Sequence, residues 1–284
     1  MNLRIAIACT VLSVSVCGVT FADKPESKTW YSKKEVVDVG TKYHFKIDNK
    51  NAYLIEPEKP LDGNPWIWRA RFPTFHAEMD KTLIKRGFHL AYLDVANEFG
   101  CPTAVARGER LYDFLVKQRG MNPKPAMEGV SRGGLFVYNY AAKHPGKVAC
   151  IYCDTPVCDF LSWPGGNGTG VGSERAFVQC LKAYGLTQQT ADQFKSQPID
   201  NAKIIADAKI PLLHIVSDND KVVPPVENTD RLRTAIQAAG HKMDVIRVAE
   251  GTEKSKGHHF THPKPQQVVE FIWKHARGNE APNR

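Results

Sequence analysis

Apolar and polar residues follow two different periods along this chain, and the changes of period divide it into strands and helices. Short apolar runs lie at 88–95, 125–130, 147–157, 210–218 and 242–251. Segments whose apolar residues recur every three or four positions lie between most of these runs. Apolar strands that alternate with amphipathic helices are typical of a mostly parallel sheet covered on both faces. We therefore predict an α/β fold.

Turn residues and helical periodicity place the other elements. Residues 42–57 alternate around Asp48-Asn49 and predict a β-hairpin, and a short strand is expected within 64–72. Amphipathic periodicity predicts helices at 74–87, 102–120, 132–146, 224–240 and 265–278. Several of these segments begin at proline or end at glycine, as helices commonly do.

One long connection interrupts this order. About fifty residues separate the strand that ends near Val157 from the strand that starts near Ile210, too many for a simple connection. The segment has a glycine-rich stretch at 162–172, and we expect it to contain two or three helices. Because ligands bind at this edge of open α/β sheets, we interpret residues 158–208 as a cap over the site.

The first residues have the features of an export signal. They combine a short basic start, an apolar run from Ile5 to Val16 and small residues around Ala22. We expect residues 1–22 to be removed and residues 23–284 to form a single domain in the periplasm or outside the cell. The apolar run is short for a membrane span, and no second run follows, so no stable membrane span is expected.

The balance of charge is basic. Lysine and arginine number 38 against 30 acidic residues, which gives a net charge of +8. A basic surface either favours acidic partners, such as uronate-rich glycans, or serves solubility alone. The basic residues are scattered and form no arginine-rich arm, so nucleic acid is not expected as a partner.

Five cysteines follow the signal, at positions 101, 150, 153, 158 and 180. Cys150 and Cys153 have the spacing of a metal or redox motif, but they fall in an apolar strand, where their side chains point to opposite faces. We therefore favour buried structural cysteines and expect no metal and no other cofactor. In an oxidising compartment, a bridge between Cys158 and Cys180 is the disulfide we consider.

A serine between glycines is the strongest chemical signal. Gly129-Val130-Ser131-Arg132-Gly133 joins a predicted strand to a predicted helix. At such a sharp turn, glycines two residues before and after the serine remove clashes with the adjacent strand and helix. The hydroxyl then stands at a helix N-terminus, where negative charge is favoured. We predict that Ser131 is a nucleophile.

A serine nucleophile needs a base, and the base needs an orienting carboxylate. In this architecture the acid and the histidine follow the serine in that order. The ends of the next strands offer Asp218, Asp220, His258, His259 and His262. We choose Asp220 as the acid and His258 as the base, with Asp154 as the alternative acid. Asp218 is then expected to cap its turn, and His262 is expected to hold its loop.

These motifs resemble those of the α/β-hydrolase superfamily over residues 42–278. The stretches "GVSRGG", "DNDKVVPP" and "KGHHF" carry the match, with "PWIWR" at the position of the oxyanion loop. Among such hydrolases, a serine followed by arginine and glycine is similar to bacterial carbohydrate esterases, including glucuronoyl esterases. The fold implied is an α/β-hydrolase fold with a mostly parallel central sheet, helices on both faces and a cap insertion.

The resemblance implies acyl transfer. Ser131 would attack an ester carbonyl, His258 would accept its proton, and Asp220 would orient the imidazole. Backbone N–H donors for the oxyanion are expected at Arg132 and, in the loop after "PWIW", at Arg69. The side chain of Arg132 either adds charge to the oxyanion hole, binds a substrate carboxylate or forms a surface salt bridge.

The leading hypothesis is an exported serine esterase that cleaves an ester of a carbohydrate or a uronic acid. Trp163 in the cap is expected either to stack on a sugar of such a substrate or to pack the cap onto the body. A peptidase of the prolyl-peptidase type ranks lower, because this sequence contains no propeller domain of the kind that usually accompanies that activity. A catalytically inactive hydrolase fold used for binding is the third hypothesis.

Overall fold

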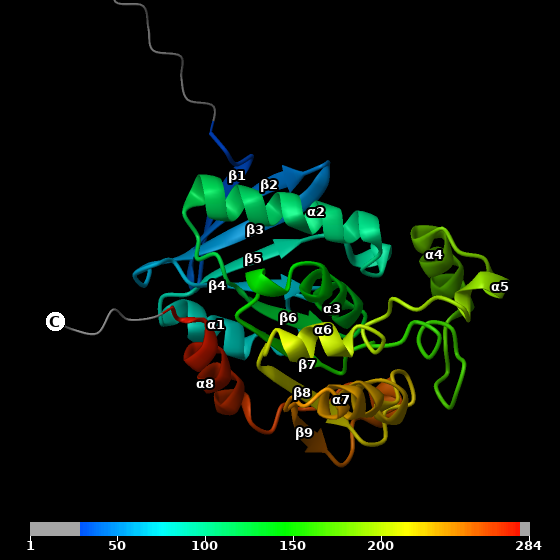
Figure 1. The fold of residues 1–284 in the computed structure, drawn as a ribbon. Helices are drawn as coiled ribbons and strands as arrows, with labels where there is room; N and C mark the ends of the chain where they lie inside the picture. Colours follow the sequence, from blue (N-terminus) through cyan, green and yellow to red (C-terminus); the bar gives the residue numbers. More distant parts are fainter. Residues whose placement is uncertain (1–28, 279–284) are drawn as a thin grey trace, which may run out of the picture. The chain divides into compact units, whose positions relative to one another are not determined.

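The computed structural model describes residues 29–278, and strands in this range form one mixed sheet (Figure 1). In spatial order the strands are β1 (Lys33–Val37), β2 (Gly40–Ile47), β3 (Lys50–Pro57), β5 (His89–Leu93), β4 (Trp66–Ala70), β6 (Ala126–Val130), β7 (Cys150–Asp154), β8 (Leu212–Ser217) and β9 (Asp244–Val248). In this order, neighbouring strands are antiparallel up to β5 and parallel from β5 onward, so the predicted mostly parallel sheet is confirmed.

Helices cover both faces of this sheet. The α-helices of residues 29–278 are α1 (Glu78–Lys85), α2 (Pro102–Asp113), α3 (Gly133–Lys143), α4 (Glu174–Tyr184), α5 (Gln188–Ala191), α6 (Ala202–Asp207), α7 (Thr229–Ala238) and α8 (Pro265–Ala276). Trp68 of β4 meets the ring of Tyr140 in α3, with centroids 4.8 Å apart. Its neighbour Ile67 belongs instead to a core cluster with residues of α1 and α8. Because successive strand side chains point to opposite faces, α1 and α8 lie on one face and α3 on the other.

Three elements differ from the sequence-based expectations. β1 was not predicted, because its sequence, KKEVV, is mostly exposed and has no core-facing run. The helix expected at 74–87 begins only at Glu78, since residues 71–77 form a loop in which Arg71, Phe72 and His76 have positive φ angles of 70°, 44° and 48°. The helix expected at 102–120 is α2, followed by a π-helical turn at Phe114–Gln118.

The segment between β7 and β8 contains three helices, of which only two stand apart from the helix layers. α6 packs against α3 and α7 and is therefore part of the layer. α4 and α5 lie together at the right of Figure 1. A hydrophobic cluster joins them to Leu135 of α3 and to Val223 beyond β8. The part of the expected cap that precedes α6 is thus anchored on elements that flank Ser131 and Asp220.

The bridge considered between Cys158 and Cys180 is not formed, because the cysteines from Cys101 to Cys180 are all free and buried. Burial, followed by the nearby Cys158, raises the pKa of Cys153. Burial, followed by the nearby Cys101, raises the pKa of Cys180. Cys150 packs in the cluster with α1 and α8, whereas the Cys153 sulfur lies against Gly129 on the side of α3, so the two point to opposite faces as predicted.

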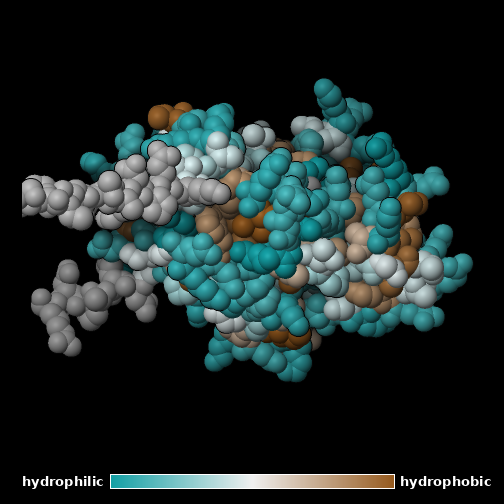
Figure 2. Space-filling model, turned by 90° about the horizontal axis from the view of Figure 1, so that it is seen from above, coloured by the Kyte–Doolittle hydropathy of each residue, from teal (hydrophilic) through white to brown (hydrophobic). Residues whose placement is uncertain are grey.

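The described surface is predominantly hydrophilic on the side shown in Figure 2, with apolar residues in small separate patches. Within residues 29–278, no helix is long and apolar enough to cross a membrane. The predicted export signal at 1–22 lies outside the described residues.

Trp68 gives a test of this packing. The Trp68→Ala variant should lose about 3–5 kcal/mol of unfolding free energy, because the side chain is 0% exposed and packs on α3. Val36→Ala, at a side chain that is 84% exposed on β1, should change the unfolding free energy very little. Chemical denaturation of both variants measures the difference, and equal losses would contradict this account.

Candidate active site

Ser131 occupies the turn between β6 and α3 with a φ angle of 51°, in the left-handed region that residues other than glycine rarely adopt. The glycines around it permit close backbone packing. A Cβ on Gly133 would lie 2.2 Å from the carbonyl oxygen of Ala70, and one on Gly134 would lie 2.6 Å from Cβ of Pro156. The Ser131 N–H donates to the Asp154 carbonyl over 2.9 Å. The turn is therefore wedged between the ends of β4 and β7.

The structure brings Ser131, His258 and Asp220 together in one hydrogen-bonded series. His258 Nε2 lies 3.1 Å from Ser131 Oγ, and His258 Nδ1 lies 2.6 Å from Asp220 Oδ2. With Asp220 as a carboxylate, Nδ1 donates to it, which leaves Nε2 to accept the serine proton. The three residues are only 7%, 8% and 4% exposed. This arrangement has the geometry of a nucleophile, a base and an orienting acid.

Asp220 is itself fixed by the backbone. Its Oδ1 accepts hydrogen bonds from the N–H groups of Val222 and Val223, at 2.8 and 2.9 Å. Two backbone N–H donors that converge on one carboxylate oxygen hold the orientation of the side chain. Asp218, two residues earlier, pairs with Arg247 instead and does not reach His258.

The remaining histidine and aspartate candidates have other partners. His262 Nδ1 accepts from the Lys264 N–H at 3.1 Å, and its Nε2 lies 3.1 Å from the Tyr152 hydroxyl, so it holds its loop as expected. Asp154, the alternative acid, pairs with His76. Among the three histidines at 258–262, only His258 therefore has a hydrogen bond to Ser131 in the described structure.

Arg69 does not lie where an oxyanion donor was expected. It is inside β4, paired with Tyr92 on one side and Glu128 on the other, and its side chain is 1% exposed. Its Nη1 donates to Asp80 at 2.7 Å and to Glu128 at 2.9 Å. The expectation placed the end of the strand too early, since the loop begins only at Arg71.

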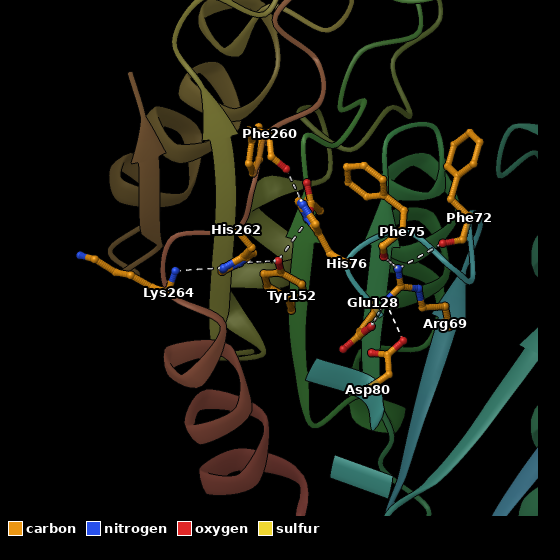
Figure 3. A network of polar contacts seen from close by, with 11 residues as sticks. Arg69, Phe72, Phe75, His76, Asp80, Glu128, Tyr152, Phe260, His262 and Lys264 are labelled. Carbon is orange, nitrogen blue, oxygen red and sulfur yellow. Dashed lines mark hydrogen bonds and ion pairs between the residues drawn. The ribbon is translucent and has the colours of Figure 1, made fainter. Parts of the chain in front are cut away.

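Arg69 holds the loop at residues 71–77 through hydrogen bonds to its backbone. Its Nη2 donates to the carbonyl oxygens of Phe72, at 3.1 Å, and of Phe75 (Figure 3). Burial, followed by the charge of Asp80, raises the pKa of Glu128 well above its usual range, and burial also raises the pKa of Asp80. One buried cation thus faces two carboxyl groups and compensates the negative charge that they carry between them.

His76, which the sequence had placed in a helix, connects the same loop to the histidine segment. Its Nδ1 is bonded to the Asp154 carboxylate, and its Nε2 lies 2.7 Å from the Phe260 carbonyl oxygen (Figure 3). A carbonyl only accepts hydrogen bonds, so Nε2 donates, and with Asp154 ionised both ring nitrogens donate. His76 is then an imidazolium that joins residues 71–77 to the segment two residues beyond His258.

Arg132 and Trp163 meet beside the nucleophile. The Arg132 guanidinium lies 5.4 Å from the Trp163 ring and 5.5 Å from the Phe99 ring. Its Nη1 donates to Asn97 Oδ1 at 3.3 Å. Among the described residues it has no ion pair with a carboxylate, so the surface salt bridge considered for it is wrong. Trp163 packs on the hydrophobic cluster that joins the cap to the body, which is one of the two roles expected for it.

A cavity of about 660 Å³ lies elsewhere, between α2, α3 and the segment around Phe194, and Ser131 is not part of its lining. Within the described residues, no group of three or more His, Cys, Asp or Glu side chains is placed to hold a metal ion.

Comparisons with known proteins agree with this architecture. A model of the prolyl oligopeptidase family matches residues 111–277, more than half of the chain. The fold is similar to that of an acylaminoacyl peptidase from Pyrococcus horikoshii, with a TM-score of 0.62 and 15% identity over 86% of this chain and 42% of that one. It is also similar to a puromycin-hydrolysing peptidase from Mycobacterium tuberculosis, with a TM-score of 0.60 and 16% identity over 82% of this chain and 38% of that one.

At such low identity these structures establish the fold alone, and the predicted α/β-hydrolase fold is confirmed. The chain spans about two fifths of the length of each of them, at 42% and 38%. No curated protein matches the sequence at a significant level.

Removal of Arg69 tests the buried charge cluster. Arg69→Met should cost about 3–5 kcal/mol of unfolding free energy, because Asp80 and Glu128 would lose the cation between them. Arg110→Met, which breaks a half-exposed pair with Asp48, should cost about 1 kcal/mol or less. Denaturation of the two variants at neutral pH makes the comparison, and an Arg69→Met protein as stable as the Arg110→Met protein would refute it.

His76 gives a test in pH. Burial acts to lower its pKa, but the hydrogen bond and charge of Asp154 outweigh burial and raise the pKa above 6.5. Its contribution to stability should be fully present below the unfolded pKa and lost as pH rises through the raised folded pKa. The loss of unfolding free energy in His76→Gln should therefore be largest near pH 6 and shrink toward pH 9.

His275→Gln is the matched control, because burial, with Lys274, lowers the pKa of His275. The loss of unfolding free energy in His275→Gln should not shrink as pH rises. Glu78, His259 and His262 are the other titratable groups that interact with His76, and they are unchanged in both variants. A His76→Gln effect that grows with pH would disprove the imidazolium assignment.

Proposed function

Because the chain belongs to the prolyl oligopeptidase family, we propose that it is a serine peptidase in which Ser131, His258 and Asp220 form the catalytic triad. The observation that carries this proposal is the hydrogen-bonded series from the Ser131 hydroxyl through His258 to Asp220. The serine is activated by a neutral imidazole whose tautomer the carboxylate sets. The three side chains are largely withdrawn from water, which strengthens these interactions.

In this mechanism Ser131 Oγ attacks the carbonyl carbon of the scissile bond, and His258 Nε2 accepts the hydroxyl proton. The imidazolium then donates that proton to the leaving amine, and an acyl-enzyme remains on Ser131. Water, deprotonated by His258, attacks the acyl carbon and releases the acid product together with free Ser131. Asp220 stays ionised throughout and stabilises the imidazolium.

The negative oxygen of the tetrahedral intermediate needs N–H donors. The backbone N–H of Arg132, at the N-terminal end of α3, is one such donor. The second would come from the backbone of the loop that begins at Arg71, which Arg69 and His76 hold in place. A donor of this kind contributes about 3 kcal/mol to the transition state in comparable sites.

The family favours an amide over the carbohydrate ester that the sequence had suggested. Similar structures carry the names of acylaminoacyl and puromycin-hydrolysing peptidases, and carbohydrate esterases are not among those described above. Trp163, for which stacking on a sugar was one of two expectations, faces the Arg132 guanidinium. We also propose that the protein is exported, on the basis of the apolar run within residues 1–22.

Two substitutions test the triad. Ser131→Ala should lower kcat on short peptide p-nitroanilides by about 10⁴-fold or more, and Asp220→Asn by about 10⁴-fold through loss of the correct tautomer. Asp218→Asn, whose side chain pairs with Arg247, should keep nearly full activity. A fluorophosphonate probe should label the parent chain and leave Ser131→Ala unlabelled.

The same assays separate the alternatives. Cleavage of p-nitrophenyl esters of sugars or uronic acids, with no cleavage of any peptide in a diverse library, would favour an esterase over a peptidase. A parent chain that resists the fluorophosphonate probe would instead indicate an inactive hydrolase fold.

A further inference from the structure

Two arginine side chains flank the turn that carries Ser131. Arg132 follows the serine directly, and Arg71 is the first residue beyond β4. Cβ of Arg71 lies 3.2 Å from the position that a Cβ on Gly133 would take, so Arg71 packs on the backbone of the turn itself. Both arginines line one narrow crevice with Phe99 and Gly133. Two cations from distant parts of the sequence therefore meet beside the nucleophile.

Neither arginine has an acidic partner among the described residues. Arg132 donates to the amide oxygen of Asn97, and Arg71 lies 4.4 Å from the Phe72 ring and beside the Tyr92 hydroxyl. Burial, followed by the charge of the nearby Asp94, raises the pKa of Tyr92. In the described structure the Nε atoms of both arginines are buried without a hydrogen-bond partner.

This arrangement has an electrostatic cost. Burial, with a further contribution from the charge of Arg71, lowers the pKa of Arg132 to about 10. Arg132 is still a cation at neutral pH, so two positive charges remain close together and partly withdrawn from water. A buried charge without a counter-charge destabilises the protein that holds it. An anion bound between the two guanidinium groups would offset that cost.

The geometry of Arg132 also suits a planar ligand. Its guanidinium lies against the Trp163 and Phe99 rings, which restrain it without using its in-plane donors. The in-plane N–H donors of a guanidinium match the two oxygens of a carboxylate. A guanidinium that is already held in position before the ligand binds loses less side-chain entropy on binding.

We propose that Arg71 and Arg132 form a subsite for a carboxylate of the substrate, so that the enzyme prefers peptides with an acidic group next to the scissile bond. This inference rests on the proposed function, and it adds the chemical class of the substrate. The carboxylate comes from an aspartate or glutamate side chain or from a chain terminus. The cap contributes through Trp163, which holds one of the two cations in place.

A set of fluorogenic peptides tests the subsite on the full chain. Each pair differs by Asp against Asn at one position on either side of the scissile bond, and a further pair differs by a free against an amidated C-terminus. At one position the acidic peptide should have a kcat/KM about tenfold or more above its neutral partner, as expected for hydrogen bonds between charged groups. The position identifies the source of the carboxylate.

Arg71→Gln and Arg132→Gln should each reduce this preference toward one, mainly through KM, while Arg132→Lys should keep part of it. Lys124→Gln, which removes a charge near the opposite end of β6, should leave the preference unchanged. If both arginine variants lower kcat equally on acidic and neutral peptides, the side chains serve the oxyanion and the subsite is refuted. The absence of any charge preference in the parent chain also refutes it.

Binding of succinate separates this inference from the proposed function. Calorimetry on the Ser131→Ala chain should detect succinate, and the signal should disappear when Arg71→Gln and Arg132→Gln are added. Succinate binding without cleavage of any peptide would overturn the peptidase and keep the anion subsite. Peptide cleavage without charge preference and without succinate binding would keep the peptidase and overturn the subsite.

Discussion

The close approach of three backbones at Ser131 is the constraint on which the rest of the site depends. A side chain on Gly133 would collide with the end of β4, and one on Gly134 would collide with Pro156, just beyond β7. The turn is thereby fixed between the two strands that neighbour β6 in the sheet. Since β8 and β9 continue the parallel order beyond β7, the loops that follow them bring Asp220 and His258 to the same edge.

Buried charge holds the loop on the other side of the nucleophile. Arg69 donates to two carbonyl oxygens of this loop from within the sheet, and His76 joins it to Asp154 and to Phe260. Asp154 accepts from the Ser131 N–H through its carbonyl and from His76 through its carboxylate. The nucleophile and the proposed oxyanion loop thus share Asp154 as one anchor.

The sequence identified the members of the hydrogen-bonded series because each has a local signal. Ser131 has its glycines, and Asp220 and His258 follow strands in the expected order. The loop at 71–77 has no such signal, since its apolar residues fit a helical period and its supports are distant. Arg69 finds a partner 59 residues away in Glu128, and His76 finds one 184 residues away in Phe260. Long-range pairs of this kind cannot be derived from periodicity in one sequence, which is why Arg69 was assigned the wrong role.

Arg71 and Arg132 differ from several other arginines of the described chain in having no carboxylate partner there. Arg69 lies between Asp80 and Glu128, Arg231 pairs with Asp159, and Arg247 pairs with two aspartates. Arg71 and Arg132 are partly withdrawn from water as well, but their described neighbours are aromatic rings, a hydroxyl and an amide. Desolvating a cation without a counter-charge lowers stability, so packing alone does not account for this pair. A ligand that supplies the missing charge does account for it, and the adjacent nucleophile makes the substrate the natural source of that ligand.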